Sequence, residues 1–169
     1  MKCLSIRQPW ALLVCVGSKM IENRSKNTIH RGEIAIHAGG NSSALKHFAE
    51  QDAWDESLRE LFSFGAIIGV ADLYDAVPFD RGLRDDPWAE GPFCFKFRNP
   101  RLFVTPIPHK GRVNLCELPV EVVQLVDEGK LDCVDTESSE LRLRCARAFP
   151  AGKIPENLLP RPSRSASQW

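Results

Sequence analysis

The sequence predicts a mostly β, α+β fold in which a small β-barrel carries a few helices on its outside. Three observations favour this class. Many short segments are rich in β-branched and aromatic residues and are separated by glycine or proline. Only two or three segments show a helical pattern. The chain has 169 residues, 43% of them hydrophobic, which is enough for one domain with a core of its own.

The first half of the chain predicts three strands and two helical segments. A helix begins at Gln8-Pro9, where proline lacks only an N–H that would be unpaired anyway, and it ends at Gly17. Residues 42–64 are helical in composition, with Ser42 or Ser43 as the N-cap. We expect the strands at 3–6, 20–25 and 32–38.

The second half predicts further strands and one short helix. In 93–98 three phenylalanines alternate with Cys94, Lys96 and Arg98, which is typical of a strand. Residues 78–92 contain three prolines and two glycines and predict a loop. We expect strands at 66–76, 93–98, 101–105 and 112–118, and helices at 120–127 and within 141–149. The domain is expected to span 1–128, followed by an extension of unknown role at 129–159 and a disordered tail at 160–169.

Composition excludes several function classes. Lys plus Arg equals Asp plus Glu, 22 of each, so no global basic field attracts nucleic acid and any such binding needs a local patch. The longest apolar run near the N-terminus, 10–16, is too short to cross a bilayer. Six cysteines occur without a CxxC pair, and no histidine pair has metal-ligand spacing. We therefore expect a cytoplasmic protein with reduced thiols, no metal, no cofactor and no membrane partner.

Three charged residues directly follow the glycine that ends the first helix. Glu22 and Arg24 are two apart on a predicted strand and so share a face, while Lys19 lies in the turn just before them. In a concave site this trio can hold the edge of a nucleobase and a phosphate together. The alternative is an ordinary Glu–Arg pair on a solvated strand.

Several blocks of the sequence resemble a known family. The segment "CLSIRQPWALLVCVGSKMIENRS", followed by "RGEIAIHA", is similar to the ASCH (activating signal cointegrator homology) domain, with its G-x-K-x-x-E-x-R motif at Gly17, Lys19, Glu22 and Arg24. Similar blocks continue to about residue 118. The resemblance implies a PUA-like β-barrel with a cleft beside the first helix that handles RNA or modified nucleosides.

Other residues are candidates for the same cleft. Ser5, Arg7 and Gln8 follow the first strand and are expected to line the rim. Trp10 and Trp88 can stack on a base, although a tryptophan that opens an apolar helix, as Trp10 does, is more often a core anchor. His37 can face the cleft from the third strand or serve as a hydrogen-bonded structural histidine.

A local basic stretch is a candidate for contacts with a nucleic-acid backbone. Residues 91–116 contain five basic residues and no acidic one. Basic side chains interleaved with phenylalanine suit phosphates and bases, although the same charges can form a solvated outer face. The five residues are Lys96, Arg98, Arg101, Lys110 and Arg112.

Two functional classes compete, and whether the protein is an enzyme stays open at this point. The first is a module that binds RNA or a nucleoside-like molecule without cleaving it. The second is a small hydrolase, a ribonuclease or an N4-acetylcytidine amidohydrolase, in which Lys19 and Glu22 would be catalytic. The resemblance implies an essential motif lysine for such hydrolases, but the amidohydrolase type has threonine where this sequence has Glu22. A coactivator-type protein-interaction domain is a further alternative.

Overall fold

The computed structural model describes residues 1–50, 56–136 and 139–149. It confirms the mostly β, α+β class. The strands are β1 (Lys2–Ile6), β2 (Ile21–Arg24), β3 (Gly32–Ala38), β4 (Ala66–Pro78), β5 (Phe93–Pro108) and β6 (Leu115–Glu117). The helices are α1 (Trp10–Cys15), α2 (Ser43–Ala49), α3 (Val120–Gly129) and α4 (Ser139–Ala148), with two short 3-10 helices, η1 (Glu56–Leu61) and η2 (Arg81–Leu83).

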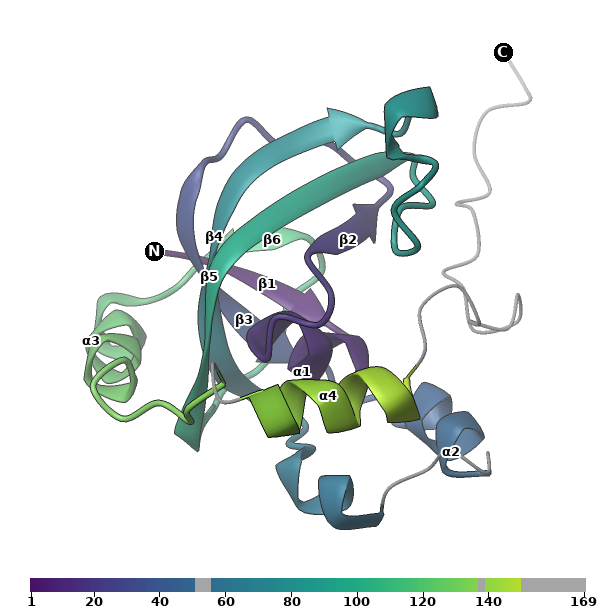
Figure 1. Cartoon of the computed structure of the whole chain (residues 1–169). Helices are drawn as coiled ribbons and strands as arrows, with labels where there is room; N and C mark the ends of the chain where they lie inside the picture. Colours follow the sequence, from purple (N-terminus) through teal and green to yellow (C-terminus); the bar gives the residue numbers. More distant parts are fainter. Residues whose placement is uncertain (51–55, 137–138, 150–169) are drawn as a thin grey trace.

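The six strands form one mixed sheet that curls into a half-barrel (Figure 1). Their order is β2-β5-β4-β3-β1-β6, so β2 and β6 are its edges. Strands β1 and β3 are parallel, and the other neighbouring pairs are antiparallel. Because the carboxyl ends of parallel strands meet at one edge of a sheet, the residues that follow β1 and β3 lie close together.

Hydrophobic side chains pack on both faces of the sheet. One core joins α1, α2 and α4 to residues such as Leu4, and a smaller one joins Val126 of α3 to residues such as Cys3. Figure 1 shows α1 and α4 together and α3 apart from them. Neighbouring residues of β1 therefore enter different cores, as the period of two in a strand requires.

Helix α1 lies directly on the sheet, and a glycine permits this contact. All six residues of α1 are buried. A Cβ at Gly69 of β4 would overlap the carbonyl oxygen of Arg101 and would lie 2.8 Å from Cys15 Sγ of α1. No larger residue fits between helix and strand without moving one of them. The residues that follow α1, including the motif, are thereby held at a fixed place on the sheet.

Three expectations about the elements need correction. The predicted strands 93–98 and 101–105 are parts of β5, in which Asn99 (φ 49°) and Pro100 form a bulge opposite Ala71. The predicted helical region 42–64 is divided into α2 and η1, with 51–55 outside the described residues. The predicted strand 112–118 is only Leu115–Glu117, because the backbone at Asn114 (φ 66°) is left-handed. Arg112 therefore lies in a loop.

The structure also describes the cysteines and the helices that bear on the excluded classes. All six cysteines are free. Among the described residues, no group of three or more His, Cys, Asp or Glu side chains has an arrangement that could hold a metal ion. None of the helices within these ranges is long and apolar enough to cross a bilayer. The predicted tail at 160–169 lies outside the described residues, and the domain boundaries stay a prediction.

Candidate functional site

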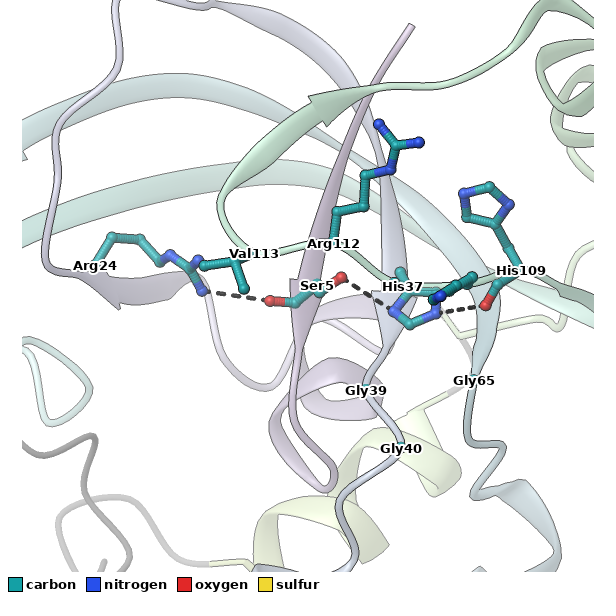
Figure 2. Close-up of a pocket in the computed structure, with 11 residues that line it drawn as sticks. Ser5, Arg24, His37, Gly39, Gly40, Gly65, His109, Arg112 and Val113 are labelled. Carbon is teal, nitrogen blue, oxygen red and sulfur yellow. Dashed lines mark hydrogen bonds between the residues drawn. The ribbon is translucent and has the colours of Figure 1, made fainter.

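A pocket of about 490 Å³ lies where several strands meet (Figure 2). Ser5 near the end of β1 pairs with His37 near the end of β3. The pocket is also lined by Gly65, which precedes β4, and by the loop 109–113 that follows β5. Arg24, the last residue of β2, reaches it from the edge of the sheet. We call this pocket, with Ser5, Arg24, His37 and the loop 109–113, the cationic pocket.

Backbone hydrogen bonds join the segments that form its wall. The N–H of Gly39 donates to the carbonyl of Ile6 at 2.8 Å, and the N–H of Gly65 donates to that of Ala38 at 2.8 Å. The N–H of His109 in turn donates to the Gly65 carbonyl at 3.0 Å. Bonds between residues so distant in sequence tie the ends of four strands together, so the wall is built before any ligand arrives.

The floor of the cationic pocket is a hydrogen-bonded histidine. His37 is 2% exposed, and its Nε2 lies 2.9 Å from the carbonyl oxygen of His109. A carbonyl oxygen only accepts, so Nε2 carries the proton and Nδ1 does not. Ser5 Oγ, 3.1 Å from Nδ1, is then the donor of the second bond. Burial lowers the pKa of His37, the hydrogen bond to the His109 carbonyl partly opposes this shift, and the charge effect of the His109 ring adds to it, so the ring of His37 is neutral near pH 7.

Three permanent cations surround this neutral floor. Arg24, Lys110 and Arg112 all line the cationic pocket, and none of the described residues that line it is acidic. Arg24 Nη1 also donates to the Ser5 carbonyl at 3.3 Å, as Figure 2 shows. Arg24 belongs to the edge strand β2 and Ser5 to β1 near the opposite edge, so this bond joins the two sides of the half-barrel. The arrangement suits an anion.

The motif residues lie beside the cationic pocket and contact one another. Lys19 Nζ lies 2.6 Å from Glu22 Oε2 and also donates to the carbonyl of Ile21. Arg24 Nη1 lies 3.9 Å from Glu22 Oε1. The Lys19 side chain is only 3% exposed and that of Glu22 14%. The three motif side chains thus meet at Glu22, and only Arg24 also lines the cationic pocket. A ligand cleft built by all three stays a prediction.

The loop between β4 and β5 covers this ion pair. Trp88 Nε1 donates to the Ser18 carbonyl at 3.1 Å, and Lys19 Nζ lies 5.8 Å from the centre of the Trp88 ring. This is within the range of a cation–π contact. We call Lys19, Glu22 and Trp88 the motif cluster. Its charges are neutralised inside the protein.

Asn23 holds that loop in place, and the sequence reasoning did not identify it. Its Nδ2 donates to the Trp88 carbonyl at 2.8 Å, while its Oδ1 accepts from the N–H groups of Glu90 and Gly91 at 2.9 and 3.0 Å. Asn23 stands between Glu22 and Arg24 and so points to the opposite face of β2. The feature of the sequence that could have indicated this role is the position of Asn23, an uncharged polar residue between the two charged motif residues Glu22 and Arg24.

Glu90 is a second residue that the sequence reasoning missed. Burial raises the pKa of the Glu90 carboxyl, the charge of Glu22 raises it further, and Lys19 opposes both effects. These interactions place Glu90 in the electrostatic surroundings of the motif cluster. The available signal was an acidic residue in the predicted loop, next to Trp88 and a Gly-Pro turn.

Three residues predicted for the cleft, Arg7 and Gln8 of the rim and the stacking candidate Trp10, have other contacts. Gln8 is fully buried: its Oε1 accepts from the N–H of Leu12 at 3.1 Å and its Nε2 donates to the Ser63 carbonyl at 3.1 Å. Trp10 belongs to the larger core, and the guanidinium of Arg7 lies 5.3 Å from its ring centre. Ser5 and His37 are therefore the predicted ligand residues that, with Arg24, line the cationic pocket.

The five residues predicted to contact a nucleic-acid backbone fall into two groups. The first group lies on β5, and each member has a carboxylate of β3 or β4 within 4.0 Å. The pairs are Lys96 with Asp75 at 4.0 Å, Arg98 with Asp72 at 3.7 Å, and Arg101 with Glu33. The second group, Lys110 and Arg112, lies in the loop 109–113, where no carboxylate among the described residues forms an ion pair with either.

Comparisons with known proteins agree with the sequence blocks described above. No protein-family model matches the chain. The chain is 30% identical over 138 residues to Activating signal cointegrator 1 of Homo sapiens and, over the same length, to that of Mus musculus. Each match covers 75% of this chain and 24% of the relative, so the chain spans about a quarter of the length of these relatives.

Solved structures of similar overall arrangement were also found. The ASCH protein of Zymomonas mobilis has a TM-score of 0.46 at 15% identity, covering 75% of this chain and 93% of that chain. A point mutant of the same protein has a TM-score of 0.49 at 16% identity, covering 75% of this chain and 96% of that one.

Proposed function

The chain is an ASCH-domain protein, and on that premise we propose that it binds single-stranded RNA or a modified nucleotide through the cationic pocket. The observation that carries the proposal is the charge balance of this pocket. Arg24, Lys110 and Arg112 line it without an acidic residue among its described lining residues. Lys110 and Arg112, which form no ion pair with a carboxylate among the described residues, are available to the phosphate groups of a ligand, and Arg24 lies 3.9 Å from its one carboxylate neighbour, Glu22.

The remaining parts of the pocket support a nucleotide-sized ligand. Its volume of about 490 Å³ is within the range of small-molecule sites. Ser5 and the neutral His37 supply polar groups on the floor, and glycines on the wall let a ligand approach the backbone. The motif cluster beside it positions β2, and with it Arg24, instead of supplying a free charge.

The proposal predicts weak binding that depends on salt. At most three phosphate contacts on a single strand, one for each cation, correspond to a slope no steeper than about −2 in log K against log salt, at about 0.7 for each contact. Fluorescence anisotropy with a labelled oligouridylate at several salt concentrations measures this slope. Replacing both Lys110 and Arg112 by Gln should reduce the magnitude of this slope to below about 1.

A matched pair of substitutions on β5 provides the control. Lys96 and Arg98 are replaced together by Gln, which removes the same charge, but both residues already face carboxylates of β4. RNA affinity should be nearly unchanged in this control. Equal losses in the two double variants would show that binding follows net charge and would contradict the proposed site.

A small hydrolase is a second candidate, favoured by the contact between Lys19 and Glu22 and by the charge effects of both on Glu90. Against catalysis, Lys19 is almost fully buried and already bonded to Glu22 and to the Ile21 carbonyl. Both bonds are to residues of β2, so the Lys19 ammonium stabilises that strand and is not free to act on a substrate. Incubating the wild-type protein with N4-acetylcytidine and with RNA, and following the products, decides between the two: sustained turnover of either substrate would overturn a binding-only function.

A further inference from the structure

We propose that the cationic pocket takes a terminal phosphate, the monoester at the end of an RNA strand, in preference to an internal phosphodiester. This inference rests on the proposed function and names the group that the pocket accepts. A phosphate monoester carries a charge of about −1.5 to −2 near pH 7 and three acceptor oxygens, whereas an internal phosphodiester carries a single negative charge.

The charge of the pocket is closer to that of a dianion than to that of a monoanion. Arg24, Lys110 and Arg112 supply three positive charges, and the described lining residues contain no carboxylate. A phosphodiester would leave most of this charge uncompensated. A monoester has one acceptor oxygen for each of the three cations, and charge-assisted hydrogen bonds of this kind are the stronger ones.

Two of the three cations flank a glycine that is packed on the floor. A Cβ added to Gly111 would lie 2.9 Å from Ser5 Oγ and 2.8 Å from Nδ1 of His37, and it would overlap Cε1 of that ring. The loop 109–113 is therefore seated directly on the Ser5–His37 pair. The hydrogen bond from His37 to the His109 carbonyl fixes the start of the same loop. Lys110 and Arg112, on either side of Gly111, are positioned by these contacts.

The protons of the floor residues are already used in hydrogen bonds within the protein. His37 Nε2–H is used by the His109 carbonyl, and the hydroxyl proton of Ser5 is used by Nδ1 of His37. The Ser5–His37 pair thus offers no free proton to a ligand, and the charge-assisted hydrogen bonds to an anion come from the three cationic side chains. Recognition of the phosphate consequently depends on Arg24 and on the loop 109–113.

The test compares three tetrauridylates of identical sequence: one with a 5′-phosphate, one with a 3′-phosphate, and one with hydroxyl groups at both ends. Affinities are measured by isothermal titration calorimetry on the whole protein. One of the two phosphorylated strands should bind about tenfold or more tightly than the hydroxyl-ended strand, as expected for added charge-assisted bonds. Inorganic phosphate should compete with that strand, which separates recognition of the phosphate itself from recognition of the nucleotide next to it.

Three variants locate the preference. The double replacement of Lys110 and Arg112 by Gln should abolish it, and the matched replacement of Lys96 and Arg98 by Gln should leave it intact. Gly111→Ala retains every charge but displaces the loop from His37, and it should reduce the preference, with folding checked by circular dichroism.

The outcomes separate this inference from the proposed function. If the hydroxyl-ended strand binds as tightly as both phosphorylated strands, the terminal-phosphate inference is wrong while RNA binding stands. If none of the three strands binds at low salt, the proposed function fails and the inference fails with it. A preference that survives the replacement of Lys110 and Arg112 also overturns the inference, because the discriminating group then lies elsewhere.

Discussion

The motif cluster and the cationic pocket lie side by side, share the strand β2, and treat charge in opposite ways. In the motif cluster, Lys19 is buried, bonded to Glu22 and covered by Trp88. In the cationic pocket, Lys110 and Arg112 have no ion-pair partner among the described residues. A charge that is compensated inside the protein shapes the fold, and a charge without such a partner is available to a ligand.

Although the two regions differ in charge, one residue, Arg24, contacts both of them. Arg24 contacts Glu22 of the motif cluster at 3.9 Å and donates to the Ser5 carbonyl at the pocket at 3.3 Å. The motif therefore influences binding by fixing where β2 ends. Substitutions that separate stability from binding can test this division.

The largest expected effect is on stability. Lys19→Met removes the buried ammonium and leaves the Glu22 carboxylate with little solvent and a more distant arginine. Breaking a buried pair by removing one partner costs about 3–5 kcal/mol. Urea unfolding followed by tryptophan fluorescence measures this loss in the free energy of unfolding.

An exposed ion pair of the same length supplies the control for Lys19→Met. Lys2 Nζ lies 2.6 Å from Glu117 Oε1, the same separation as in the buried pair, but the two side chains are 31% and 64% exposed. Lys2→Met should cost less than about 1 kcal/mol. Similar losses of stability in both variants would mean that burial does not make the Lys19–Glu22 pair more important for stability than an exposed pair. The proposed division between a structural motif cluster and a binding pocket would then be wrong.

The second effect concerns the residue that belongs to both regions. Arg24→Gln removes one of the three pocket cations and should lower RNA affinity about ten- to a hundredfold, because a lost charged hydrogen bond costs about 1.5–3 kcal/mol. Its effect on unfolding should stay near 1 kcal/mol, since Lys19 still neutralises Glu22. Anisotropy and urea unfolding on the same samples give both numbers.

Arg24→Lys sharpens this result. It keeps the positive charge but loses the planar fork that reaches the Ser5 carbonyl. Affinity should recover in part if the pocket acts mainly through charge. A stability loss in Arg24→Gln as large as that in Lys19→Met would place Arg24 inside the motif cluster and not in the pocket.

The sequence predicted the elements of the fold better than the partners of its charges. The alternation in 93–98 was enough to place Lys96 and Arg98 on one face of a strand. It did not show that Asp72 and Asp75 stand opposite them, because register between β4 and β5 depends on bulges such as the one at Asn99. The basic stretch contains no acidic residue of its own, and the acids that Lys96 and Arg98 face come from the neighbouring strand β4.

The candidate site was predictable only in part for a related reason. The spacing of Glu22 and Arg24 correctly indicated a shared face, and both now contact each other. Nothing local in the sequence indicates that Ser5 and Arg112 line one pocket, since the two residues are brought together by the pairing of β6 with β1. Gln8 was predicted for the rim, yet it is buried and its side-chain oxygen accepts a hydrogen bond from the Leu12 N–H in the first turn of α1. Such roles depend on tertiary contacts.

The smallest expected effect is a pH dependence of stability that arises from the pocket floor. Burial lowers the pKa of His37 in the folded protein, whereas the unfolded chain has the ordinary value of about 6.5. Below that pH the unfolded state binds more protons than the folded state, so the free energy of unfolding decreases as pH falls from 7 towards 5. At higher pH both states are neutral at this position and the effect disappears.

The surroundings of His37 and a matched variant complete this last prediction. The nearest titratable neighbour is His109, whose ring centre lies 6.2 Å away, and Arg24, Lys110 and Arg112 line the same pocket. The side chains of these groups oppose a positive charge on His37, whereas the hydrogen bond to the His109 carbonyl favours it; burial is the larger effect, so the pKa of His37 is lowered. Burial also lowers the pKa of His30, so the wild-type curve must be compared with that of His37→Gln, in which His30 still titrates. Urea unfolding at pH 5, 6 and 7 should show a smaller decrease in the variant than in the wild type. Parallel curves would mean that protonation of His37 does not destabilise the folded state. The floor of the cationic pocket would then accept a positive charge as readily as the positions of Arg24, Lys110 and Arg112 do.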